Sequence, residues 1–208
     1  MRKKCLNCPH SEPYCVGRSF PVKKFSKKKI LADILTALKE LYCKDFDLIK
    51  RNAHERCISA RFYAYFERLF SEKYKDLNID PEYNKNGVDP KYYGYTSDDR
   101  YTYAFPDVIV HKRDCNRHNT IYMEFKPIKN RPEADFKKLK YFTSNSCLGY
   151  THDDRELRYA YKHGVGIAYG VDEVKFFYFT GGDGPIHEKS HDTSSWENKE
   201  QVVDISQR

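Results

Sequence analysis

A chain of 208 residues is long enough for one compact domain with a substantial core and short for two. Its 18 Tyr and 13 Phe exclude wholesale disorder, although 32% of the residues are charged. The sequence contains no apolar run of about 18 residues, and basic and polar residues rather than a hydrophobic signal core follow Met1. We therefore expect a cytoplasmic protein that does not enter a membrane.

The net charge of +7 is concentrated at the start of the chain. Residues 1–29 contain nine Lys or Arg and one acid, whereas residues 30–208 are close to neutral. Such a basic arm suits nucleic acid, because each neutralised phosphate releases counterions, and it equally suits a solvated terminus. The residues of the arm that we expect to bind nucleic acid are Lys23, Lys24, Lys27, Lys28 and Lys29.

The seven cysteines are scattered and odd in number, which indicates reduced thiols rather than a disulfide framework. Four potential zinc ligands lie in the arm, namely Cys5, Cys8, His10 and Cys15. The second pair is spaced too tightly and irregularly for the usual zinc arrangement. An interaction protein that binds zinc through these four residues is therefore a weak interpretation.

Two amphipathic helices are expected first. Residues 28–43 place Ile30, Ile34, Leu38 and Leu41 on one stripe, and residues 52–73 do the same with Ile58, Phe62, Phe66 and Leu69. Glu55 falls on the core-facing side of the second helix, where a carboxylate needs a partner. The alternative is an acid at a helix start that stays in water and is favoured by the helix dipole.

A short extended segment over 78–84 contains Pro81, which is typical of a sheet edge or a bulge. The turn-forming pair Asn86-Gly87 ends it. A long Tyr-rich connection then covers residues 85–105. Its rings, interleaved with Lys85, Lys91 and Arg100, could stack on bases and contact phosphates, or they could pack on the edge of the domain.

Two strongly β-prone segments follow and are expected to form a hairpin. They cover residues 105–111 and 120–126, and a polar, turn-forming stretch joins them. A helix over 132–144 comes next, and a polar stretch then leads to the two closing strands, which cover 165–170 and 174–179.

The order of these elements predicts an α/β (α+β) domain in which helices flank a central mixed β-sheet. We expect this domain to span residues 30–180. The basic arm precedes it, and residues 181–208 have the composition of a polar, disordered tail.

The second strand of the hairpin carries the residues with chemical potential. Strand alternation places Glu124 and Lys126 on one face and Ile121, Met123 and Phe125 on the other. Charges in a central strand are costly unless they bind something. Asp107 should lie close to Glu124, because paired strands are about 4.8 Å apart. The alternative is an exposed ion pair between Glu124 and Lys126 on a surface strand.

Two carboxylates, a backbone carbonyl and waters form a site suited to Mg²⁺ or Mn²⁺. Such an ion can lower the pKa of a bound water, neutralise phosphate oxygens and shield the leaving alkoxide. Lys126 can orient the water and stabilise the additional negative charge at phosphorus. This combination predicts hydrolysis of phosphodiester bonds.

Pro106-Asp107, followed seventeen residues after the aspartate by Glu124-Phe125-Lys126, resembles the PD-(D/E)XK (restriction-endonuclease-like) nuclease superfamily. The order of elements over 52–180 is also similar to the core of that family. The resemblance implies a Mg²⁺-dependent nuclease, with DNA favoured over RNA. It further implies that Asp107, Glu124 and the Phe125 carbonyl bind the metal and that Lys126 is the catalytic base or positions the water.

Members of the family often add a glutamate from the first core helix, and Glu55 occupies that place. Asp80 and Glu82 are secondary candidates for metal binding. The alternative function is a catalytically inactive module of the same fold that binds nucleic acid or protein through the basic arm. The oligomeric state is open, a homodimer included. We expect structural or surface roles for His111, His118, His152, His163 and Ser59, which lack metal-ligand spacing.

Overall fold

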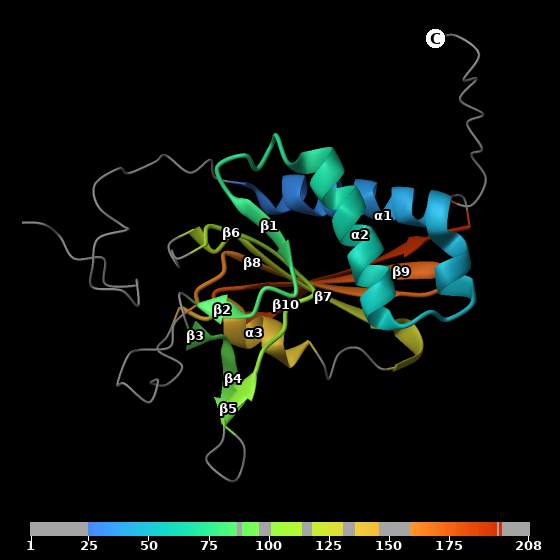
Figure 1. Cartoon of the computed structure of the whole chain (residues 1–208). Coiled ribbons are helices and arrows are strands. Elements are labelled where there is room, and N and C mark those ends of the chain that lie inside the picture. Colours follow the sequence, from blue (N-terminus) through green and yellow to red (C-terminus); the bar gives the residue numbers. More distant parts are fainter. Residues whose placement is uncertain are drawn as a thin grey trace, which may run out of the picture.

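The computed structural model describes residues 25–86, 89–95, 101–113, 118–130, 136–145, 159–194 and 196. Its elements are shown in Figure 1. The helices are α1 (Lys27–Lys50), α2 (Glu55–Phe70) and α3 (Lys137–Thr143), with a 3-10 turn at Ile128–Asn130. The strands are β1 (Asn78–Pro81), β2 (Lys85–Asn86), β3 (Asp89–Pro90), β4 (Tyr92–Tyr95), β5 (Tyr101–Tyr103), β6 (Val108–His111), β7 (Ile121–Pro127), β8 (His163–Tyr169), β9 (Glu173–Thr180) and β10 (Asp183–Asp192).

A six-stranded mixed sheet forms the centre of the domain, in the order β1-β6-β7-β8-β9-β10. Only β7 and β8 run parallel, and every other neighbouring pair is antiparallel. The predicted mixed sheet and the β6–β7 hairpin are thus confirmed. β7 lies between β6 and β8, so its charged side chains are in the interior of the sheet and not at an open edge.

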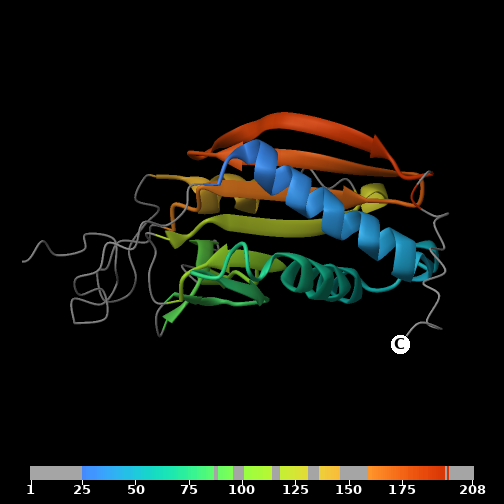
Figure 2. The same cartoon turned by 90° about the horizontal axis from the view of Figure 1, so that it is seen from above.

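The helices α1 and α2 cover one face of the sheet, and α3 and the β4–β5 ribbon lie on the other (Figure 1). Seen from above, α1 crosses the β8–β10 side of the sheet and α2 lies toward the β1–β7 side (Figure 2). Each face has its own buried cluster. Ile121, Met123 and Phe125 enter the cluster under α1 and α2, whereas Tyr122 enters the cluster under α3. The alternation predicted for β7 is therefore present.

The helix α1 is longer than predicted because it continues beyond a kink. The four apolar residues of its predicted stripe are fully buried. At Asp45 the backbone leaves the helical region, with φ −131° and ψ 25°, close to the predicted end at residue 43. The Asp45 carboxylate accepts hydrogen bonds from Arg61 and Tyr65 of α2. This contact joins the two helices at the kink, and Ile49 is buried beyond it.

The helix α2 is shorter than predicted and begins at Glu55. The Nδ1 atom of His54 accepts a hydrogen bond from the backbone N–H of Arg56 and so caps the helix start. Ile58, Phe62 and Phe66 of the predicted stripe are fully buried, but Leu69 is exposed. The predicted stripe is therefore wrong for its last member.

The folded domain extends past residue 180. The strand β10 pairs with β9 from Asp183 to Asp192 and forms an edge of the sheet. Beyond it, the ring of Trp196 contacts Tyr42 of α1 edge-on, with centroids 5.2 Å apart. A disordered tail over 181–208 is thus the wrong expectation for its first half, because backbone pairing with β9 compensates for the low hydrophobicity of the segment. Residues 197–208 lie outside the described residues.

The Tyr-rich connection folds into the short strands β2 to β5 rather than one long loop. Lys91, for which contact with phosphates was one of two alternatives, is buried, and its Nζ donates to the backbone carbonyls of Tyr83 and Lys85. Arg100 lies outside the described residues. Across the described parts of the chain, no helix combines the length and apolarity needed to cross a bilayer.

Candidate active site

Asp107 and Glu124 lie side by side on neighbouring strands. The β6–β7 register pairs Val108 with Met123, and one further step places Asp107 opposite Glu124. Both carboxylates are buried, at 8% and 2% exposure. The Asp107 Oδ2 atom accepts a hydrogen bond of 2.7 Å from the backbone N–H of Phe125. This bond fixes the aspartate against the strand that carries the glutamate.

Both carboxyl groups have a raised proton affinity. Burial and then the charge of Glu124 raise the pKa of Asp107 to about 8, against the effect of the Phe125 N–H. Burial also raises the pKa of Glu124, although Lys138 opposes the shift. Without a cation, the pair therefore holds a proton near neutral pH.

Glu124 is only half satisfied. Its Oε2 atom accepts from the Lys138 Nζ atom of α3 at 3.1 Å, whereas its buried Oε1 atom has no hydrogen-bond partner among the described residues. The neighbouring hydroxyl of Tyr122 is buried and close enough to Glu124 to oppose the rise in its pKa, but it makes no hydrogen bond of normal geometry within the described part of the chain. A buried carboxylate oxygen of this kind is expensive unless a ligand binds it.

Lys126 pairs with Glu55 at the start of α2 rather than with Glu124. Its Nζ atom lies 2.7 Å from the Glu55 Oε1 atom, and both side chains are about one-quarter exposed. The expected partner for the Glu55 carboxylate is thus present, and an exposed Glu124–Lys126 ion pair is excluded. Tyr169 of β8 lies nearby, with its ring 6.5 Å from the Phe125 ring, and the charges of Glu55 and Asp107 add to burial in raising the pKa of its hydroxyl. Its buried hydroxyl has no hydrogen-bond partner among the residues described.

The donor set fits a hard divalent cation. Asp107 and Glu124 offer adjacent carboxylates, and the Oε1 atom of Glu124 has its hydrogen-bonding capacity unused. The described residues contain no group of three or more His, Cys, Asp or Glu side chains that could hold a metal ion. A bound cation would therefore need the predicted Phe125 carbonyl, water or substrate oxygens to complete its coordination.

No family model, no curated protein and no solved structure matches the chain. We therefore infer the function from the residues of the site and their geometry. The mixed sheet and flanking helices agree with the α/β (α+β) class.

The secondary candidates Asp80 and Glu82 have separate partners. Burial alone would raise the pKa of Asp80, but hydrogen bonds from His111 and Arg113 outweigh it and lower the pKa to about 2. Asp80 is thus fully engaged on β1, and the structural role expected for His111 is present. Glu82 pairs with Arg56 at 3.3 Å, and its backbone N–H donates to the Asp107 carbonyl.

The described lysines of the basic arm lie away from the carboxylates. Lys27, Lys28 and Lys29 form the first turn of α1. The Lys27 Nζ atom lies 4.5 Å above the Tyr178 ring on the α1 face of the sheet, whereas Glu124 is on the α3 face. Lys23, Lys24 and the potential zinc ligands in the arm lie outside the described residues.

Sequence reasoning missed Lys138, Tyr122 and Tyr169. The only local hint for Lys138 is its place beside the apolar residue Leu139 in a basic helix, which does not say what the lysine contacts. Tyr122 could have been found from strand alternation, since it shares a face with Glu124. The position of Tyr169 follows from the parallel pairing of β7 and β8, which the sequence does not reveal.

Proposed function

We propose that the protein is a metal-dependent nuclease that hydrolyses phosphodiester bonds of DNA. The observation that carries this proposal is the unpartnered, buried Oε1 atom of Glu124 next to the carboxylate of Asp107. A lysine follows two residues later on the same strand. A divalent cation accounts for all three features. It would bind the unpartnered Oε1 atom of Glu124, remove the repulsion between the carboxylates of Asp107 and Glu124, and lie near the Lys126 amine, which suits phosphate chemistry.

In this proposal, Asp107, Glu124 and the Phe125 carbonyl hold Mg²⁺ or Mn²⁺. The ion supplies Lewis acidity toward a water and toward the phosphate oxygens. Lys126 orients the attacking water and stabilises charge at phosphorus. Glu55 positions Lys126, since a lysine Nζ on a flexible stem needs a fixed partner to be aimed.

Lys138 has a second part in this site. It supplies the positive charge at Glu124 while no cation is bound, and its side chain is 29% exposed. In this proposal, a cation at Glu124 frees the Lys138 amine to contact a phosphate of the substrate. Lys138→Ala is expected to strengthen Mn²⁺ binding and to slow cleavage at saturating Mn²⁺.

A cleavage assay tests the proposal directly. Purified protein is incubated with supercoiled, linear duplex and single-stranded DNA, with Mg²⁺, with Mn²⁺ or with chelator. Asp107→Ala and Lys126→Ala should each reduce the cleavage rate by about 10²-fold or more. Asp76→Ala and Lys75→Ala, two exposed positions between α2 and β1, serve as matched controls. Equal rates for the wild type and the two site variants would refute the proposal.

Metal binding provides a second measurement that does not depend on turnover. Titration calorimetry with Mn²⁺ should show one site in the wild type and a large loss of affinity in Asp107→Ala. The Asp76→Ala control should bind as the wild type does. A protein that binds no Mn²⁺ but retains salt-sensitive binding of DNA through residues 1–29 would instead be the inactive binding module.

A further inference from the structure

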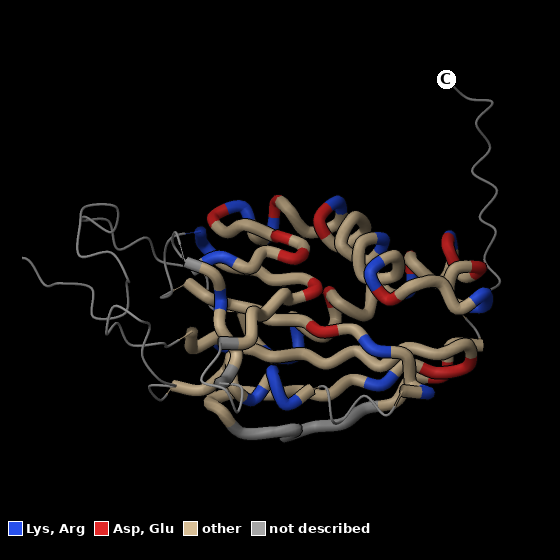
Figure 3. Tube along the Cα trace, turned by 60° about the horizontal axis from the view of Figure 1, so that its bottom comes forward, with Lys and Arg blue, Asp and Glu red and all other residues tan. Residues whose placement is uncertain are grey.

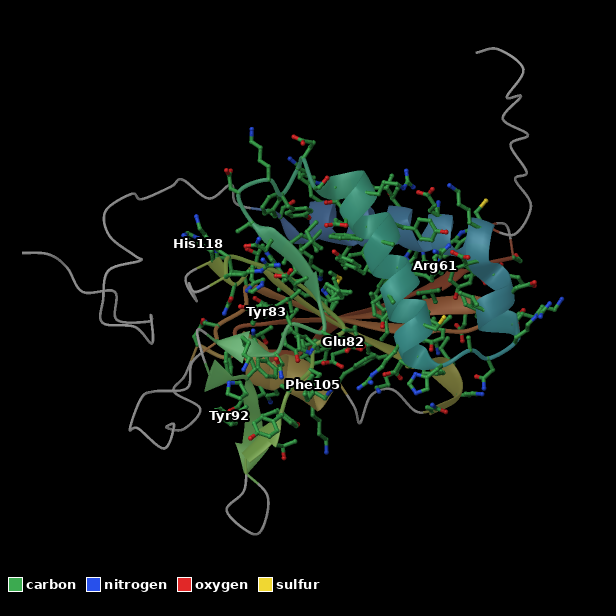
Figure 4. All side chains as sticks on the ribbon, viewed as in Figure 1. Arg61, Glu82, Tyr83, Tyr92, Phe105 and His118 are labelled. Atoms are coloured by element: carbon green, nitrogen blue, oxygen red, sulfur yellow. The ribbon has the colours of Figure 1, made fainter. Side chains whose placement is uncertain are left out.

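Two aromatic rings on the α3 face are left in solvent beside the candidate active site. Tyr103 is 56% exposed and Phe105 is 48% exposed, whereas the other large aromatic side chains described are at least partly covered. Phe105 lies two residues before the buried Asp107. Figure 4 labels it together with Glu82, which follows β1 and donates its backbone N–H to the Asp107 carbonyl. Exposed rings that gather at one place on a folded domain mark a binding surface.

Contacts with the domain hold the Tyr103 ring and the backbone between the two rings. The Tyr103 ring packs against Tyr92, with centroids 5.7 Å apart, and the Tyr92 backbone N–H donates to the Tyr159 hydroxyl at 2.8 Å. Ala104, between the two exposed rings, donates its N–H to the carbonyl of the buried Lys91. A ligand that stacks on Tyr103 therefore has little conformational freedom of that ring to remove.

A basic helix, α3, lies on the same face of the sheet as the β4–β5 ribbon. The helix α3 carries three lysines and no acid (Figure 3). Lys137 is exposed and lies four residues before Tyr141, whose ring contacts Tyr93 of β4 edge-on at 5.2 Å. Residues four apart share one side of a helix, so Lys137 is on the side of the ribbon. The next residue, Lys138, reaches Glu124.

We infer that an unpaired stretch of DNA lies over this surface. Its bases stack on Tyr103 and Phe105, its phosphates lie along the α3 lysines, and the strand ends at Asp107 and Glu124. In a duplex the base faces are already stacked on one another, so only unpaired bases can use exposed rings in this way. The inference rests on the proposed nuclease function for the end point of the strand, and it narrows the substrate to single-stranded or locally opened DNA.

Binding measured without turnover tests this inference. Every protein carries Asp107→Asn and the buffer contains chelator. Fluorescence anisotropy reports the Kd for a labelled oligothymidylate and for a hairpin duplex of equal length. Tyr103→Ala and Phe105→Ala should each raise the Kd for the oligothymidylate about 5-fold or more, and change the Kd for the duplex less than about 2-fold. Tyr103→Phe and Phe105→Tyr, which keep a ring, should bind as the parent does.

Two controls separate stacking from general effects. Leu69→Ala and Lys75→Ala change an exposed apolar side chain and an exposed lysine at the far end of α2, and they should leave both Kd values unchanged. Lys137→Ala should weaken binding of both probes and lower the salt dependence by about 0.7 for the single strand. A strand that lacks its bases should bind equally to the parent and to Phe105→Ala.

Ring variants that weaken duplex and single-strand binding equally, or neither, would overturn the inference. A strand without bases that still loses affinity in Phe105→Ala would overturn it too. Tighter binding of oligouridylate than of oligothymidylate would overturn the assignment to DNA. No step of the assay needs metal or cleavage. A protein that cleaves no DNA but shows ring-dependent binding would therefore refute only the proposed nuclease function. A nuclease whose DNA binding does not depend on the two rings would refute only the inferred binding surface.

Discussion

Replacing Asp107 by asparagine should stabilise the metal-free protein at alkaline pH. The aspartate is buried beside Glu124 and accepts a hydrogen bond from Phe125. Asparagine has nearly the same shape, and its carbonyl oxygen keeps that hydrogen bond. It carries no charge at any pH, so it mimics the protonated aspartic acid. The substitution therefore removes the repulsion between the two carboxylates and little else.

The size of the effect follows from the pKa of Asp107. Burial and the charge of Glu124 raise it from the ordinary 3.8 to about 8 in the folded protein. Between these pH values the folded protein holds a proton that the unfolded chain has released. The stability contributed by this proton is fully present below pH 3.8 and is lost as pH rises through about 8, at ~1.4 kcal/mol per pH unit. The wild type should thus lose about 4 kcal/mol between pH 5 and pH 8 through this group.

Urea unfolding at pH 5 and pH 8 in chelator measures this loss. The variant lacks the titration of Asp107, and the other titrating groups are common to both proteins. The difference in unfolding free energy should therefore widen in favour of Asp107→Asn as pH rises. Structural relaxation and water penetration weaken buried charge interactions, so about 2 kcal/mol is the smallest widening that we expect. Parallel pH profiles for the two proteins would refute the reasoning, and Mn²⁺ should reverse the order by stabilising only the wild type.

Three further predictions follow from other contacts. Glu55→Gln should slow cleavage about 10- to 100-fold, because the Lys126 side chain loses the carboxylate that orients it, and metal affinity should be unchanged. Loss of Mn²⁺ binding would contradict this role. Asp80→Asn should cost about 1–3 kcal/mol in urea unfolding at neutral pH, because the Arg113 guanidinium loses its counter-charge and the buried His111 imidazole loses a charged hydrogen-bond partner. It should also remove the loss of stability that the wild type shows as pH falls from 3.8 toward 2. In Gly166→Ala the new Cβ would lie 2.6 Å from the Phe136 ring, so α3 must shift, with a cost of about 1–3 kcal/mol and slower cleavage; an unchanged melting temperature would argue against this packing.

The part of the candidate site carried by β6 and β7 could be predicted because its causes are local. Alternation puts Glu124 and Lys126 on one face, and a polar turn between two β-prone segments makes the hairpin that brings Asp107 to Glu124. The pairing of Lys126 with Glu55 was expected only in part. The sequence indicated that Glu55 faces the core, but which partner it meets depends on the angle at which α2 crosses the sheet.

The parts that could not be predicted depend on contacts distant in the chain. Lys138 reaches Glu124 because α3 lies close to the sheet, and that approach requires the absence of a side chain at Gly166 beneath the Phe136 ring. Lys91 is buried because backbone carbonyls gather around its amine, a feature that no composition rule reveals. The strand β10 is stabilised by pairing with β9, so its own polar sequence looks like a tail.

The contact between Trp196 and Tyr42 has a consequence for biosynthesis. The first helix of the domain is completed by a ring more than 150 residues later, and β10 closes the sheet only shortly before that ring. A ribosome must therefore release almost the whole described domain before its earliest helix can find all its neighbours. Such distant pairing slows folding and leaves β9 with an open edge in the nascent chain. Until β10 pairs with it, β9 is an apolar strand with an open edge to which a chaperone can bind.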